Sequence, residues 1–277
     1  MIVHFIALYA VAGALVGVIA GLLGLGGAII VVPFLVWQLP EVGVSPHVLM
    51  HVAVATSLGL VVCSSLVSGL NHHRYGNVQW SLVFKMLIGL IIGALLGTFI
   101  AKHIPSKVLQ LFFGFFVLFV SWSMAFPKEQ VQSRSMPEGM QLNLVSTIIG
   151  ILCILLGVSG GSLLVPYFNR CNIPLRQAIA TASVCTFPVA LTGVTLLMLS
   201  TPSNLAMPNH SIGYVYWPAL LGLVLPCILL VPVGVRLAMR LEVILIRRIF
   251  AALLFLIGSD MIYEASMTLR PFFARIL

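Results

Sequence analysis

Charged residues are scarce in this chain of 277 residues. Asp, Glu, Lys and Arg make up only 7% of it, and six residues are acidic, whereas a soluble domain carries about 25% charged residues. Hydrophobic residues make up 61%, so the few charged groups cannot cover a water-soluble surface. The composition therefore excludes a soluble globular protein and predicts an integral membrane protein, with the lipid bilayer as its surroundings.

Several sequence motifs for enzymes and binding proteins are also absent. The five cysteines form no CxxC pair, and there is neither an HExxH motif nor a P-loop for nucleotides. His47 and His51 have the i, i+4 spacing that a metal can use, but no third ligand accompanies them. The basic residues are scattered, so the net charge of +8 does not indicate nucleic-acid binding. We therefore expect no enzyme activity, no metal site and no cofactor.

Apolar segments occupy most of the chain and are long enough to cross a bilayer. They run approximately over residues 2–38, 44–70, 80–101, 108–126, 142–168, 178–199, 213–235 and 249–263. A spanning helix takes about 20 residues. The segments therefore predict an all-α polytopic membrane protein with about eight transmembrane helices.

The chain also contains an internal repeat. GLGGAIIVVPF (24–34) matches GVSGGSLLVPY (157–167) at an offset of 133 residues, and AVATS (53–57) matches AIATA (178–182) at an offset of 125. Such self-similarity indicates a duplicated unit. It predicts two tandem four-helix repeats, at residues 1–126 and 142–277, joined by the polar linker 127–141.

The topology has two interpretations. With one crossing per segment, the Lys and Arg residues divide eight to five between the two faces, which predicts that the more basic face is cytoplasmic and that both termini lie outside. However, residues 2–38 would form a helix of about 55 Å, too long for one crossing of a hydrocarbon core of about 30 Å. If this segment crosses twice, each half has five crossings and the repeats are inverted.

Two glycine clusters interrupt apolar segments at equivalent places in the repeats. They comprise Gly24, Gly26 and Gly27 in the first repeat, and Gly157, Ser159, Gly160 and Gly161 in the second. Glycine permits backbone conformations that break a helix, and a break inside the membrane must be buried in protein or line a cavity. The free amides that begin the next half-helix suit an anion. We therefore expect both clusters to bind substrate.

Other glycines recur every fourth residue. Gly13, Gly17 and Gly21 form one such row, and Gly89, Gly93 and Gly97 form another. This GxxxG spacing predicts close packing between helices rather than a binding site.

The repeated motifs resemble those of a known family of membrane proteins. GLLGLGGAIIVVPFL and LLGVSGGSLLVPYF, each followed by an ATS or ATAS string, together with NHHRYGNVQW (71–80), resemble the TauE/SafE sulfite exporter family of membrane permeases. The resemblance covers nearly the whole chain. It implies transport of sulfur-containing organic anions, sulfite or related small carboxylates and sulfonates, driven by an ion gradient. One departure is Ser159, which stands where the first cluster has Gly26.

Hydroxyl groups inside apolar segments complete the expected substrate site. Thr56 and Thr181 occupy matching places in the repeats and can donate to an anion without a buried countercharge. The remaining expected ligands are Ser57, Asn71 and Ser183. Charged side chains inside the membrane are costly, so we expect the amides and hydroxyls to bind the anion without a lysine.

The sequence thus predicts a secondary transporter for a small anion, in the bacterial cytoplasmic membrane, with a proton or sodium as the coupling ion. An anion channel would share each of these features and is the nearest alternative. An intramembrane enzyme that binds metal or haem is a more distant alternative, because the motifs for such sites are absent.

Overall fold

The computed structural model describes residues 2–23, 27–126, 136–200, 207–238 and 243–273. Nearly all of them are helical. The helices of the first half are α1 (Ile2–Leu23), α2 (Ala28–Gln38), the 3-10 helix η1 (Leu39–Val42), α3 (Leu49–Arg74), α4 (Trp80–His103) and α5 (Ser106–Ala125). Those of the second half are α6 (Met140–Leu156), α7 (Gly161–Arg170), α8 (Leu175–Met198), α9 (Trp217–Ala238) and α10 (Val243–Phe273).

A short hairpin precedes α9 and was not expected from the sequence. Strands β1 (Ser211–Ile212) and β2 (Val215–Tyr216) pair antiparallel, with Ser211 opposite Tyr216. Gly213 makes the turn with a φ of +56°, in the left-handed region that favours glycine. Each strand has only two residues, so a sequence pattern of alternating polarity could not have revealed them.

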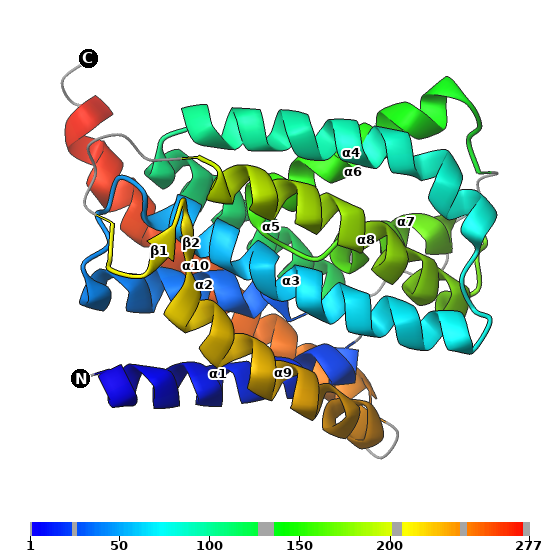
Figure 1. Cartoon of the computed structure of the whole chain (residues 1–277), viewed down its shortest axis with the longest axis horizontal. Helices are drawn as coiled ribbons and strands as arrows, with labels where there is room; N and C mark the ends of the chain where they lie inside the picture. Colours follow the sequence, from blue (N-terminus) through cyan, green and yellow to red (C-terminus); the bar gives the residue numbers. More distant parts are fainter. Residues whose placement is uncertain (1, 24–26, 127–135, 201–206, 239–242, 274–277) are drawn as a thin grey trace.

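The long helices pair between the two halves of the chain. The most extensive contacts join α1 to α9 and α4 to α6, and α5 packs on α10 as α3 packs on α8. In Figure 1 these helices run roughly along the long axis of the molecule, and α1 begins at the end where α10 finishes. The two halves are therefore interlocked and do not form two separate bundles.

Glycines allow the closest of these helix pairs. A Cβ atom at Gly13 or Gly17 would lie 2.9 Å from the Cα of Leu223 or Cys227 on α9. On α4, a Cβ at Gly89 would lie 2.6 Å from the Asn143 carbonyl oxygen of α6. Real side chains essentially never approach so closely, so the backbones touch at these points. The prediction that these GxxxG rows pack helices is confirmed for Gly13, Gly17, Gly89, Gly93 and Gly97, whereas the surroundings of Gly21 lie outside what the structure describes.

Six of the described helices are long and apolar enough to cross a membrane, namely α3, α4, α5, α8, α9 and α10. Shorter apolar helices lie at residues 7–20, 28–42 and 140–156. The chain is thus an all-α polytopic membrane protein, as predicted. The segments 2–38 and 142–168, counted above as single crossings, are each divided into two helices, α1 with α2 and α6 with α7.

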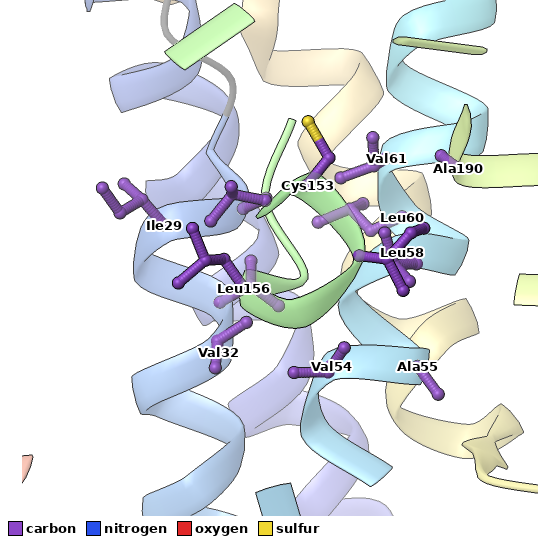
Figure 2. Close-up of a cluster of buried hydrophobic side chains, with 14 of the residues drawn as sticks. Ile29, Val32, Val54, Ala55, Leu58, Leu60, Val61, Cys153, Leu156 and Ala190 are labelled. Carbon is purple, nitrogen blue, oxygen red and sulfur yellow. The ribbon is translucent and has the colours of Figure 1, made fainter. Parts of the chain in front are cut away.

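The core lies where the end of α6 meets α2 and α3. Figure 2 shows Leu156 near Ile29 and Val32 of α2, while Val54 and Leu58 follow α3 on the other side. All five side chains are at most 4% exposed, and Val32, Leu58 and Leu156 are fully buried. This packing brings the start of α2 close to the end of α6, and with it the two regions that the glycine clusters interrupt.

Candidate functional site

Two short helices begin at the glycine clusters. Helix α2 follows Gly27, and α7 begins at Gly161 directly after Gly160. Each contains a proline, Pro33 or Pro166, five residues after its first residue. Because proline has no N–H, the carbonyl one turn earlier loses its helical partner. Both short helices therefore combine a glycine start with a weakened interior, as expected for the second part of a broken helix.

The second glycine cluster is held against α3 of the other half. Ser57 Oγ donates a hydrogen bond of 2.8 Å to the carbonyl oxygen of Gly157. Gly157 ends α6 with a φ of +62°, and a Cβ there would lie 2.9 Å from the Cα of Val54. A side chain at position 157 would therefore meet both an unfavourable backbone conformation and a clash. The structure brings together two of the predicted site residues here, Ser57 and Gly157.

Ser159 and Gly160 belong to the same turn. Ser159 Oγ accepts the N–H of Gly161 at 3.2 Å, and a Cβ at Gly160 would lie 2.6 Å from Thr186 Oγ1 of α8. The serine that replaces the glycine of the first cluster thus satisfies one of the amides at the start of α7. Thr186 is a buried hydroxyl that the sequence did not single out.

This turn also matches the letters GxSxG of a hydrolase nucleophile elbow, over residues 157–161. That motif requires a strand before the serine and a helix after it. Here the serine follows helix α6, so the required context is not met and the match does not indicate a nucleophile.

Gly27 is the residue of the first cluster that the structure describes, whereas Gly24 and Gly26 lie outside the described residues. A Cβ at Gly27 would overlap the side chain of Val16 and lie 2.9 Å from its carbonyl oxygen. Gly27 is therefore a packing glycine between α1 and α2, in addition to its place at the start of α2.

Thr56 and Thr181 make the same contact in opposite halves. Thr56 Oγ1 accepts the backbone N–H of Tyr216 at 3.1 Å, and Thr181 Oγ1 accepts that of Gln79 at 3.1 Å. Tyr216 and Gln79 each precede the tryptophan that begins a long helix, α9 or α4. Each threonine therefore joins its own half to the start of a helix in the other half. Both threonines are fully buried.

The two threonines lie at separate points along the α3–α8 pair. Near one end Leu58 packs on Gly193, and toward the other Ser68 Oγ donates to Ser183 Oγ at 3.0 Å. Residue numbers rise along α3 while those of their contact partners on α8 fall, so the two helices are antiparallel. Thr56 and Thr181 thus stand toward opposite ends of the pair. Asn71, near the end of α3, is exposed.

Polar side chains that the sequence did not single out surround each threonine contact. At the Thr181 contact, Gln79 Nε2 donates to Gln177 Oε1 at 2.6 Å. At the other end, Tyr9 donates to Gln38 Oε1, and the Tyr9 ring lies 6.2 Å from Phe34 and 6.4 Å from Tyr216, centroid to centroid. In the sequence, each of these sites is marked only by a glutamine at the border of an apolar segment. Such a glutamine does not indicate a site until its hydrogen-bond partner is known.

The β1–β2 hairpin packs against the end of the α3–α8 pair that contains Thr56. Tyr214 N donates to the Leu197 carbonyl of α8 at 3.1 Å, and the Tyr214 ring lies 5.6 Å from that of His51. Burial raises the pKa of both Tyr214 and Tyr216 above the ordinary value, because removal from water disfavours the phenolate. Both hydroxyls therefore stay protonated at neutral pH.

Two cavities open beside this framework. One, of about 440 Å³, lies between the start of α4 and residues 136–142, and it is lined by Gln79, Trp80, Lys85 and Glu138 among others. The other, of about 290 Å³, lies between α2 and α10 and includes Asp260. Lys85 is exposed, and the expectation that it does not bind the anion stays a prediction.

One acidic residue of α10, Glu264, takes part in a contact with α5. Glu264 forms an ion pair of 3.0 Å with Lys107 and accepts a hydrogen bond of 3.0 Å from Gln110. The Glu264 side chain is 52% exposed, so this ion pair adds little to stability.

A metal site has no support in the described part of the chain, where no group of three or more His, Cys, Asp or Glu side chains could hold an ion. His47 is exposed, whereas His51 is buried and bonded to the Ala101 carbonyl. The i, i+4 histidines therefore do not form a paired ligand set.

Comparison with known proteins gives a consistent answer. The family model described as "Sulfite exporter TauE/SafE" matches residues 9–261. A "Probable membrane transporter protein" of Haemophilus influenzae is 30% identical, over 93% of this chain and 98% of its own length. Relatives with similar descriptions are 26% identical, one from Methanocaldococcus jannaschii over 91% of this chain and 93% of its own length, and YunE of Bacillus subtilis over 92% and 96%. No solved structure matches the chain.

Proposed function

Because this chain belongs to the sulfite exporter TauE/SafE family, we propose that it is a secondary transporter for a small anion. The anion is sulfite, a related sulfonate or a small carboxylate, and its movement is coupled to an ion gradient. Relatives from bacteria and an archaeon that are described as probable membrane transporters support this proposal. The protein would work in the cytoplasmic membrane.

One observation carries the proposal: two short helices, α2 and α7, begin at glycines within the bundle instead of at its ends. Gly160 and Gly161 are buried, and Gly27 is half-buried. A helix start is electropositive and presents amide donors, which favours an anion over a cation. Backbone of this kind is tolerated in a membrane only where protein or a cavity surrounds it, and transporters use it to form substrate sites.

The absence of buried Lys and Arg among the described residues supports binding by amides and hydroxyls. Among the residues whose burial the structure describes, the buried polar side chains include neither Lys nor Arg. We therefore assign the anion to the amides of the two glycine clusters together with the hydroxyls of Thr56 and Thr181, as two half-sites toward opposite ends of the α3–α8 pair. The hydroxyl hydrogens of Ser57 and Ser183 are donated to the carbonyls of Gly157 and Ile179, so we assign these two serines to positioning the backbone of the site. Such a site avoids the cost of an unpaired charge when it is empty. Asn71 is exposed, so we assign it to the entrance.

We also propose that residues 1–126 and 142–277 are inverted repeats of five helices, with 127–141 as their linker. This replaces the count of four helices per repeat. The antiparallel packing of the equivalent helices α3 and α8 supports it, as do the matching contacts of α1 with α9 and α6 with α4. Repeats of opposite orientation around a shared site allow the site to open to either face in turn.

Flux measurements in reconstituted liposomes test the proposed function. Labelled sulfite, an alkyl sulfonate and a small carboxylate would be supplied with and without imposed proton and sodium gradients. A secondary transporter gives saturable flux, substrate counterflow and accumulation driven by one of the gradients. Flux that does not saturate and follows only the anion's own gradient would identify a channel instead, and no flux of any of these anions would reject the proposal.

A further inference from the structure

His51 is an ionisable side chain buried near the start of α3. It is only 6% exposed, and the buried polar residues otherwise comprise Ser, Thr and Gln within the part of the chain whose burial is described. No Asp, Glu, Lys or Arg appears among them. His51 is therefore the group in this buried set that can gain or lose a charge near neutral pH.

One nitrogen of the His51 ring is committed to the backbone. Nε2 lies 2.9 Å from the carbonyl oxygen of Ala101, in the last turn of α4. A carbonyl can only accept, so Nε2 carries the hydrogen and the neutral ring leaves a bare lone pair on Nδ1. This bond fixes the tautomer, because it determines which nitrogen is free.

The other nitrogen has no partner among the described residues. Nδ1 of His51 is buried and makes no hydrogen bond there. A buried polar atom without a partner is costly, and such atoms are uncommon unless they serve a purpose. A bare lone pair on an imidazole is a proton acceptor, so the ligand that this atom suits is a proton.

Within the part of the chain whose burial is described, no buried acid lies near His51 to hold a permanent charge on the ring. The hairpin presents the neutral Tyr214 phenol, α4 presents the carbonyl of Ala101, and Ile104, directly after α4, presents its backbone. The charged or titratable groups of the adjoining turns are His47, Lys102 and His103, which are exposed, and Lys107, which is paired with Glu264. The ring can therefore exist in both protonation states.

The contacts of His51 connect it to the proposed transport machinery. Its ring packs on Tyr214, and Tyr216 of the same hairpin donates to Thr56, which lies five residues after His51 on α3. The hairpin is also bound to α8 through the Leu197 carbonyl. A charge on His51 thus acts directly on the hairpin that joins the two halves.

We propose that His51 is the proton-binding residue that couples anion movement to a proton gradient. This rests on the proposed function, and it names the proton rather than sodium as the coupling ion. Nδ1 takes up a proton from the side of higher proton concentration and forms an imidazolium. It returns the proton on the other side in the same cycle as the anion, so no bond other than N–H forms or breaks.

The test compares His51→Gln with His47→Gln in proteoliposomes, with sulfite and an alkyl sulfonate run in parallel. The sulfonate is included because its charge does not change with pH. Gln keeps an N–H that can reach the Ala101 carbonyl, but it cannot bind a proton. A gradient of one pH unit supports about tenfold accumulation for one coupled proton. Counterflow without a gradient is measured for each variant.

The proposal expects His51→Gln to lose the pH-driven accumulation while its counterflow stays within about twofold of the wild type, because substrate exchange needs no net proton movement. His47→Gln should keep both. Proton-driven accumulation that survives in His51→Gln overturns the proposal and leaves the transporter assignment intact. A wild type that carries no anion overturns both.

A direct measurement covers the case in which His51→Gln fails to insert. Detergent-purified wild-type protein in weak buffer is mixed with the alkyl sulfonate, and the pH change is recorded between about pH 5 and pH 8. Proton uptake or release that accompanies sulfonate binding supports the proposal. Binding without any proton exchange across this range overturns it.

Discussion

Ser57 of α3 donates a hydrogen bond of 2.8 Å to the carbonyl oxygen of Gly157, which lies 100 residues later in the chain. Gly157 ends α6 in a left-handed conformation, so its carbonyl no longer belongs to a regular helix. One hydroxyl of the first half thus holds the broken helix of the second half in place.

Ser57→Ala should destabilise the protein by about 1–3 kcal/mol, because it leaves the Gly157 carbonyl buried without this donor. Thermal unfolding in detergent measures the loss. Ser64→Ala is the matched control, since Ser64 Oγ donates only to the Val61 carbonyl of its own helix. Equal unfolding midpoints for Ser57→Ala and Ser64→Ala would show that the contact between the halves does not stabilise the protein.

Gly93→Leu should prevent assembly of α4 with α6. A Cβ at Gly93 would overlap the Thr147 carbonyl oxygen and lie 2.9 Å from the Cα of Gly150, and backbone atoms cannot move aside as a side chain can. Size-exclusion chromatography of a fluorescent fusion reports the fraction of folded protein. The control is Ile92→Ala at the neighbouring exposed position, and equal amounts of folded protein from both variants would contradict the packing role.

Gly160→Ala should impair the protein, and Thr186→Ala should partly restore it. The added methyl group would meet Thr186 Oγ1 at 2.6 Å, and removal of that hydroxyl creates room. Overpacking of this kind costs about 1–3 kcal/mol. The unfolding temperatures of the wild type, the two single variants and the double variant give a double-mutant cycle. If the two changes in unfolding temperature simply add, the two positions do not interact.

Thr56→Val and Thr181→Val should each weaken the apparent substrate affinity by about 1–3 kcal/mol, since valine removes a hydroxyl from a buried polar site. Valine also leaves the N–H of Tyr216 or Gln79 without its acceptor. Thr56→Ser and Thr181→Ser keep the oxygen and should retain binding. Concentration dependence of labelled sulfite flux measures the effect.

The Lys85→Gln variant should behave as the wild type in the same flux assay, because Lys85 is exposed. If Lys85→Gln loses binding while both valine variants keep it, the anion site lies at the surface near α4 rather than between the repeats.

The sequence by itself determined the features that depend on local spacing and composition. The shortage of charge requires a bilayer, and the small residues at Gly89 and Gly93 require a close helix neighbour whatever its identity. The matching AVATS and AIATA strings likewise singled out Thr56 and Thr181 as equivalent. These properties are read along the chain, because they follow from each residue's own size, polarity and neighbours.

Tertiary structure decided which residues meet. The spacing of Gly93 does not identify α6 as its neighbour. The sequence around Thr56 does not identify Tyr216 as its hydrogen-bond partner, because Tyr216 lies 160 residues away. The glycine cluster predicted a break within residues 2–38, but the way α2 folds back on α1, with Gly27 against Val16, follows from packing. The unpaired nitrogen of His51 is visible only after Ala101 has taken the other one, because hydrogen-bond satisfaction depends on neighbours that the fold supplies.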